Sequence, residues 1–184
     1  MDDAHDGADQ KGPVAGRELA IWNKALMRAL LVALALGVAT SAAAQERWAT
    51  YANPRFGTTI DYPADLLAQR DPPPENGDGQ SFRTRDGRTH LAVWGAYNVE
   101  GNSPQGYVAN FVAPNGGITY RQITPRYFVV SGTRNGDIFY QRCNFAAARE
   151  GVIDCFEVTY PAADKAAMDK VVPRLGRSLR SGAR

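Results

Sequence analysis

Residues 137–160, "DIFYQRCNFAAAREGVIDCFEVTY", contain both cysteines of the chain. Aromatic and β-branched residues fill the two arms, and the turn-like "AAREG" separates them, so the stretch predicts a β-hairpin. With the turn centred on Arg149, Cys143 faces Cys155. Directly opposed residues bring their Cβ atoms to about 4.5–5.5 Å, which is close to disulfide distance. We therefore predict a Cys143–Cys155 disulfide, the alternative being two reduced core cysteines.

Residue alternation gives this hairpin two apolar faces, and each of them has to be covered. One face carries Ile138, Tyr140, Val152, Phe156 and Val158, and the other carries Phe139, Cys143, Phe145, Ile153 and Cys155. The chain offers two amphipathic helices, one for each face. We therefore predict an α+β domain in which a mainly antiparallel sheet of about seven strands lies between helices, an α/β/α layered arrangement.

The two helices are predicted from start and stop signals. The first covers 103–117, with Ser103 as N-cap and Pro104 at the first helical position. The second covers 162–181, where apolar residues recur at helical spacing. Pro173 lies inside it and is expected to kink or restart the helix, because proline lacks a backbone donor.

Short strands are predicted on both sides of these helices. They cover 47–51, 56–62, 118–124 and 126–134, together with a hairpin at 81–98 that turns at Asp86–Gly87. The segment "PADLLAQ" predicts one turn of helix. The proline- and glycine-rich stretch that follows, 70–80, predicts a long irregular loop.

An apolar run from Ala29 to Thr40 follows two basic residues and ends in the small residues "SAAAQ". This order is typical of a secretory signal peptide, which we predict over 27–44 with cleavage between Ala44 and Gln45. The run is shorter than the ~20 residues that span a bilayer, so no stable membrane span is expected after cleavage.

The rest of the chain divides at this signal. Residues 1–26 are polar and acidic and predict disorder; Met27 is the more natural start for a signal peptide, so a start drawn too far upstream is the alternative. Residues 45–184 are predicted as a single exported globular domain, periplasmic or secreted through a cleaved Sec-type signal. Such a compartment is oxidising and favours the disulfide.

Two segments carry a resemblance to a known fold. The opening "RFGTTIDYPADL" (55–66), a meander of strands and the closing "YPAADKAAMDKVVPRLGRSL" (160–179) resemble the PsbP-like fold. The resemblance extends over nearly all of 48–180. It also includes small exported alphaproteobacterial proteins of unknown function with an "FGxxIDYP" opening. It implies a protein that binds other macromolecules or assists assemblies, and its motifs define no catalytic residue.

The Asp86–Gly87 hairpin is the candidate binding feature. With a two-residue turn, Arg83 faces His90 and Arg85 faces Arg88, and these four side chains share one side. Like charges placed opposite each other are destabilising, so the cluster predicts a patch for an anion or an acidic partner. The alternative is that solvated arginines splay apart at the hairpin tip.

Catalytic and metal signals are sparse. His90 is the one histidine after the predicted signal peptide, and both cysteines are assigned to a disulfide, so no catalytic residue is predicted. No cofactor or metal is predicted either. The alternative is an irregular calcium loop formed by Asp71, Glu75, Asn76 and Asp78, although a solvated loop explains these residues better.

These observations order three functional hypotheses. The first is an exported, non-enzymatic accessory or binding protein that acts through protein–protein contacts, at the arginine hairpin or the 70–80 loop. The second is a cell-envelope binder of small ligands or polyanions, and the third is an enzyme of unknown class. A formal net charge of +2 and the absence of a basic helix exclude nucleic acid as the expected partner.

Overall fold

The computed structural model describes residues 46–147 and 151–182. The predictions for 1–26 and 27–44, and the cleavage site between Ala44 and Gln45, lie outside the described residues. The predicted hairpin is confirmed: β8 (Asp137–Phe145) pairs antiparallel with β9 (Val152–Pro161). Cys143 lies opposite Cys155 in this register, and the two form a disulfide.

Around this hairpin the chain builds a seven-stranded sheet in the order β3-β4-β5-β9-β8-β7-β6, in which every pairing is antiparallel. The five further strands are β3 (Gln69–Arg70), β4 (Gly79–Arg83), β5 (His90–Tyr97), β6 (Ile118–Ile123) and β7 (Tyr127–Arg134). The predicted α+β class and the sheet of about seven strands are therefore confirmed.

The first two strands form a separate two-stranded sheet instead of extending the main one. They are β1 (Trp48–Ala52) and β2 (Thr59–Pro63). The predicted strand 56–62 begins later because the Asn53 side chain accepts hydrogen bonds from the backbone N–H groups of Arg55 and Phe56, which forms a turn. The small sheet is anchored to the large one through Thr58, whose buried hydroxyl donates to Asp154 on β9 at 2.5 Å.

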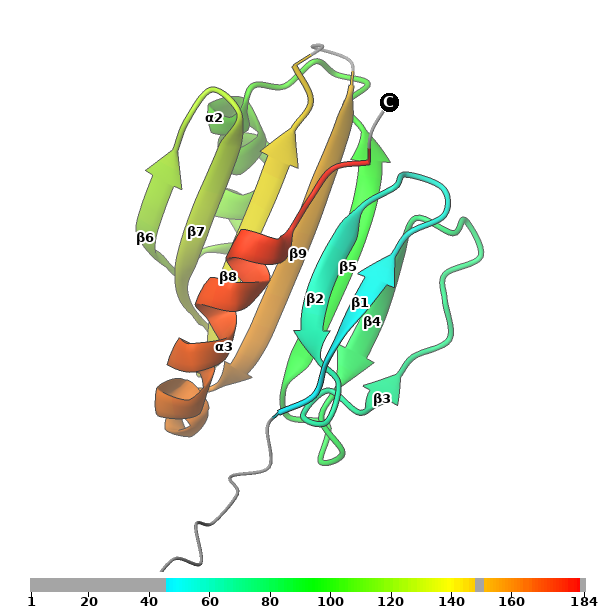
Figure 1. The fold of residues 1–184 in the computed structure, drawn as a ribbon. Helices are drawn as coiled ribbons and strands as arrows, with labels where there is room; N and C mark the ends of the chain where they lie inside the picture. Colours follow the sequence, from blue (N-terminus) through cyan, green and yellow to red (C-terminus); the bar gives the residue numbers. More distant parts are fainter. Residues whose placement is uncertain (1–45, 148–150, 183–184) are drawn as a thin grey trace, which may run out of the picture. The chain divides into compact units, whose positions relative to one another are not determined.

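Each face of the large sheet carries its own apolar cluster. One cluster lies under α3 (Lys165–Ser178) and the β1–β2 sheet, and joins Met168, Val171 and Leu175 to Phe156 and Val158. The other lies under the helical segment 104–115 and includes the disulfide. Figure 1 shows α3 in front of β8 and β9, with α2 behind the sheet. The predicted covering of both faces by helices is confirmed.

The helices differ in detail from the sequence prediction. The first begins as predicted, with the Ser103 hydroxyl accepting from the N–H of Gly106 at 3.1 Å, but it changes type along its length. Its parts are α2 (Pro104–Tyr107), the π-helical η1 (Val108–Val112) and the 3₁₀ turn η2 (Ala113–Asn115). The N–H of Ala113 donates to the carbonyl of Val108 five residues earlier, and Pro114 has no N–H to continue an α-helix.

The closing helix runs through its proline without restarting. A 3₁₀ turn, η3 (Ala162–Asp164), leads into α3, which continues past Pro173 to Ser178. The predicted helical turn in "PADLLAQ" is wrong, because this segment forms hydrogen-bonded turns after β2, with the N–H of Leu67 donating to the carbonyl of Pro63. Within 46–147 and 151–182, no helix is long and apolar enough to cross a bilayer.

Candidate functional site

The arginine hairpin has the predicted register but a longer turn. Arg83 lies opposite His90 at the ends of β4 and β5. The N–H of Thr84 then donates to the carbonyl of Thr89, so the connection is the four residues 85–88 and not the two-residue Asp86–Gly87 turn. Asp86 explains the difference, since its carboxylate accepts from the hydroxyl of Thr84 and the N–H of Arg88 and thereby closes a wider loop.

Carboxylates of the same chain already neutralise two of the clustered arginines. Arg83 forms an ion pair with Asp71, its Nε lying 2.8 Å from the Oδ1 atom. Arg88 lies 2.7 Å from Asp86 and 3.8 Å from Asp164. The compensating anion that like charges require is therefore supplied internally at these positions. Binding of an external anion by the patch stays a prediction.

Hydrogen bonds keep the hairpin tip in its charged, paired state. The pKa of the Asp86 carboxyl lies well below its usual range, first because the Thr84 hydroxyl donates to it and then because Arg88 does. His90 is exposed, and its Nε2 lies 2.6 Å from the carbonyl oxygen of Gly87. The guanidinium of Arg85 is exposed and has no ion pair within the described part of the chain.

The hairpin tip borders a surface pocket of about 590 Å³, which we call the hairpin pocket. Three segments meet there: the turn after β2, the 84–89 loop, and the start of α3. Its lining is Asp65, Leu66, Thr84, Arg85, Asp86, Arg88, Thr89, Asp164, Ala167 and Met168. The pocket thus combines an apolar floor with charges of both signs, which suits a small ligand better than a long polyanion.

The 70–80 region offers little for a cation. Asp71 is occupied by Arg83, and the carboxylate of Asp78 accepts a hydrogen bond from the amide of Asn76 at 2.7 Å. Across the described ranges, no group of three or more His, Cys, Asp or Glu side chains is placed to hold a metal ion. The calcium-loop alternative gains no support from this arrangement.

A second surface, which sequence reasoning did not single out, lies on the other half of the sheet. Tyr120 of β6, Tyr127 of β7, and Tyr140 and Arg142 of β8 share one face according to the strand register, and we call these four residues the tyrosine face. It is the face that α3 covers, but α3 packs over β8 and β9 and leaves β6 and β7 open (Figure 1). Tyr120 keeps 53% of its surface exposed.

Side-chain contacts hold the tyrosine face in one arrangement. The guanidinium of Arg142 lies 4.5 Å from the ring centre of Tyr127, and its Nε donates to the amide oxygen of Asn144 at 3.0 Å. The hydroxyl of Tyr127 in turn accepts from the Gln122 amide at 3.2 Å. Partial burial raises the pKa of the Tyr140 phenol, so this ring stays neutral beside Arg142.

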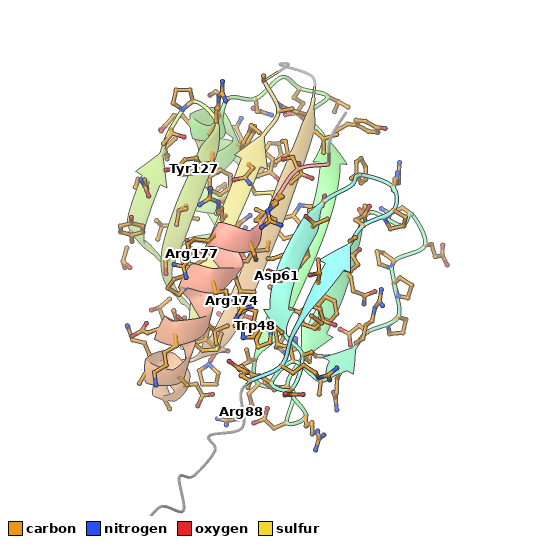
Figure 2. The ribbon with its side chains drawn as sticks, in the orientation of Figure 1. Trp48, Asp61, Arg88, Tyr127, Arg174 and Arg177 are labelled. Atoms are coloured by element: carbon orange, nitrogen blue, oxygen red, sulfur yellow. A yellow bond between two sulfur atoms is a disulfide. The ribbon has the colours of Figure 1, made fainter. Side chains whose placement is uncertain are left out.

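The exposed side of α3 borders this face and is basic along its second half. It carries Lys170, Arg174 and Arg177, all exposed. Arg174 lies over the ring of Trp48, 3.9 Å from its centre, on the side of β1. Figure 2 shows Arg177 extending from α3 on the side of β7, with Tyr127 further along that strand. None of these three cations has an ion pair within 46–147 or 151–182.

A sequence signal for the tyrosine face exists, although it is not a local motif. Between residues 101 and 147 the one carboxylate is Asp137, whereas Arg121, Arg126, Arg134 and Arg142 all fall there. Charge asymmetry of this kind indicates a surface for an oppositely charged partner. Recognising the face also needs the pairing of β6, β7 and β8, which the strand pattern alone does not fix.

Comparisons with known proteins support the fold. No family model matches the chain, and no curated protein matches it. Among solved structures it is similar to cyanobacterial PsbP (CyanoP) from Synechocystis sp. PCC 6803, with a TM-score of 0.51 and 11% identity over 76% of this chain and 95% of that one. The Ran-binding protein Mog1p from Saccharomyces cerevisiae aligns with a TM-score of 0.47 and 11% identity over 73% and 95%. The chain therefore has a PsbP-like fold, as the sequence resemblance predicted.

Proposed function

We propose that this protein is an exported, non-enzymatic accessory or binding protein that contacts another protein through the tyrosine face. The observation that carries the proposal is the position of Tyr120, half exposed beside the Tyr127–Arg142 pair on strands that no helix covers. Exposed aromatic surface of this kind marks an interaction site more often than a plain solvent face.

The chemistry of these residues suits a protein partner. Tyrosine and arginine are enriched at the centres of protein interfaces, because a tyrosine ring buries a large area at small entropic cost and arginine offers several donors. Arg142 is already held by Tyr127 and Asn144, so binding would not have to order it. A rigid aromatic and cationic surface can therefore supply binding energy efficiently.

Two further features favour an exported binder over an enzyme. The disulfide removes both cysteines as nucleophiles, and a disulfide between neighbouring strands is compatible with an oxidising compartment. The exposed His90 contacts a backbone carbonyl and has no serine or carboxylate printed as a partner in the described part of the chain. A nucleophile–base–acid set is therefore not assembled around His90 in these residues.

The test is cross-linking in the periplasm of the native host, followed by purification of the tagged protein and mass spectrometry. We expect one abundant partner that is lost with Tyr120→Ala. Tyr97→Ala is the matched control, because Tyr97 is equally exposed at 52% but lies at the end of β5. Capture of no partner, or equal retention by both variants, would contradict the proposal.

A second candidate function is a small-ligand or polyanion binder of the cell envelope at the hairpin pocket. It is favoured by one observation: the arginines that the sequence singled out border this pocket. Replacing Arg83, Arg85 and Arg88 together by Ala should then remove a salt-dependent affinity for heparin. Unchanged binding in the triple variant would eliminate the polyanion form of this hypothesis.

A further inference from the structure

We infer that the tyrosine face recognises an acidic polypeptide segment. Carboxylates of this segment would pair with Arg142 and Arg177, and an apolar or aromatic side chain would pack on Tyr120. This inference rests on the proposed function and adds the chemistry of the partner. It follows from three properties of the surface: the sign of its charge, the availability of that charge, and the residues that surround it.

The sign of the charge is uniform on this face. Asp137, the one carboxylate between 101 and 147, belongs by register to the opposite face, together with Phe139 and Cys143. On α3 the nearest acid is Asp169, whose carboxylate is engaged by Lys165 at 2.7 Å one turn earlier. The surface from Arg142 to Arg177 is therefore cationic without internal compensation, which attracts an anionic partner.

The charge of Arg142 is available for binding. Its Nε is used by Asn144 and its plane lies over Tyr127, yet within the described ranges no carboxylate pairs with its terminal nitrogens. A guanidinium stacked on an aromatic ring keeps its outer N–H groups directed outward in a fixed plane. This arrangement suits bidentate pairing with a carboxylate.

The surroundings favour a polypeptide over a membrane. Beyond its cations, the exposed side of α3 carries Ala166, Ala167 and Pro173, with no large apolar side chain that could enter the acyl region. The apolar contribution comes instead from Tyr120, which stands on a sheet strand. Tyrosine next to arginine on a firm surface is the composition of a protein-binding hot spot.

The first experiment measures binding of fluorescently labelled poly-L-glutamate to the exported form of the chain by anisotropy. The double variant Arg142→Gln/Arg177→Gln should bind about tenfold more weakly, since loss of charge-assisted hydrogen bonds has an effect of this size. The double variant Arg85→Gln/Arg88→Gln removes the same charge at the hairpin and is the matched control, expected to bind as the parent protein does. Circular dichroism checks that both variants fold.

Two outcomes of this assay would overturn the inference. One is equal weakening in both double variants, which would mean non-specific attraction to net charge. The other is tighter binding to phosphatidylglycerol vesicles than to poly-L-glutamate, with the same dependence on Arg142 and Arg177, which would assign the surface to anionic lipid.

Partner capture separates failure of the inference from failure of the proposed function. If the cross-linked partner is lost with Tyr120→Ala but retained by Arg142→Gln/Arg177→Gln, the contact surface is right and the acidic chemistry is wrong. If the partner is retained by all of these variants, the proposed contact surface itself fails. Loss of the partner in both sets supports the two proposals together.

Discussion

The two ends of the sheet use arginine in opposite ways. At the β4–β5 end, Arg83 and Arg88 are held by Asp71 and Asp86 at a hairpin tip. At the β6–β8 end, Arg142 lies over the ring of Tyr127 and has no carboxylate partner within the described residues. The first end is rich in arginine but internally neutralised, and the second has fewer arginines on its open face but keeps their charge.

This difference shows that the number of arginines in a segment does not measure the charge it offers to a partner. Arg83 and Asp71 are brought together by the short pairing of β3 with β4, which no local pattern around the arginines reveals. The surface with available charge is the one whose neighbouring strands lack carboxylates. Each of the following experiments tests whether that contrast between the two ends is real.

The largest effect is expected from the covalent link in the middle of the sheet. Cys143 and Cys155 join β8, which carries Arg142, to β9, which continues to the hairpin end through β5. Cys143→Ala/Cys155→Ala should lower the free energy of unfolding by about 2–3 kcal/mol, because the short loop that the bond closes is then free in the unfolded chain. Denaturant unfolding measures this change.

Hydrogen exchange in the same variant sharpens the comparison of the two ends. Amides of β8 should exchange faster than those of β4, since β8 loses its covalent tie whereas β4 keeps its neighbours. Adding a reducing agent to the double variant is the control and should change nothing further. An unfolding free energy equal to that of the parent protein would mean that the bond does not stabilise the fold.

A smaller effect should follow from removing the internal neutralisation at the hairpin. Asp71→Asn/Asp86→Asn deprives Arg83 and Arg88 of their partners and should raise hairpin affinity for poly-L-glutamate about fivefold, the size of a few exposed ion pairs. This variant would make the hairpin end resemble the tyrosine face.

The matched control for this charge change is Glu75→Gln/Asp78→Asn. It removes the same two charges from the neighbouring loop, where neither residue forms an ion pair with a described arginine. An equal gain in affinity in both variants would show that only net charge matters. The contrast between paired and free arginines would then have no functional meaning.

Much of the fold follows from the sequence because its strongest signals are local. Two cysteines placed symmetrically about Arg149 fix the β8–β9 register, and the alternation of apolar residues gives both faces of that hairpin. The two covering helices follow from Ser103 and from the apolar spacing of 162–181. These features depend on neighbours in sequence, so a pattern can identify them.

The rest depends on contacts between distant segments. The separate β1–β2 sheet is held by Thr58 against Asp154, and the longer hairpin turn follows from the bonds of Asp86. Which part of the sheet stays open is decided by where α3 packs. Gly176 allows α3 to approach Tyr140 closely, because a Cβ there would lie 3.4 Å from the phenol oxygen. No alternation pattern contains that information.

The smallest effect concerns the protonation of the hairpin tip. In the folded protein the pKa of Asp86 lies below the ~3.9 of an unperturbed aspartate, chiefly because Thr84 and then Arg88 donate to it. A depressed pKa means that the contribution of this carboxylate to stability is present above the unfolded value and is lost as pH falls through the folded value. The tip should therefore stay paired throughout the mildly acidic range.

A titration of the side-chain carboxyl signals by NMR measures this directly. Thr84→Val should raise the Asp86 midpoint more than Arg88→Gln does, because the hydroxyl is the larger cause. Asp65, whose pKa is lowered by bonds from Arg47, is the internal control and should not respond to either change. An Asp86 midpoint at the ordinary aspartate value would mean that Arg88 is not held by this carboxylate in solution, and the hairpin would then offer its charge as Arg142 does.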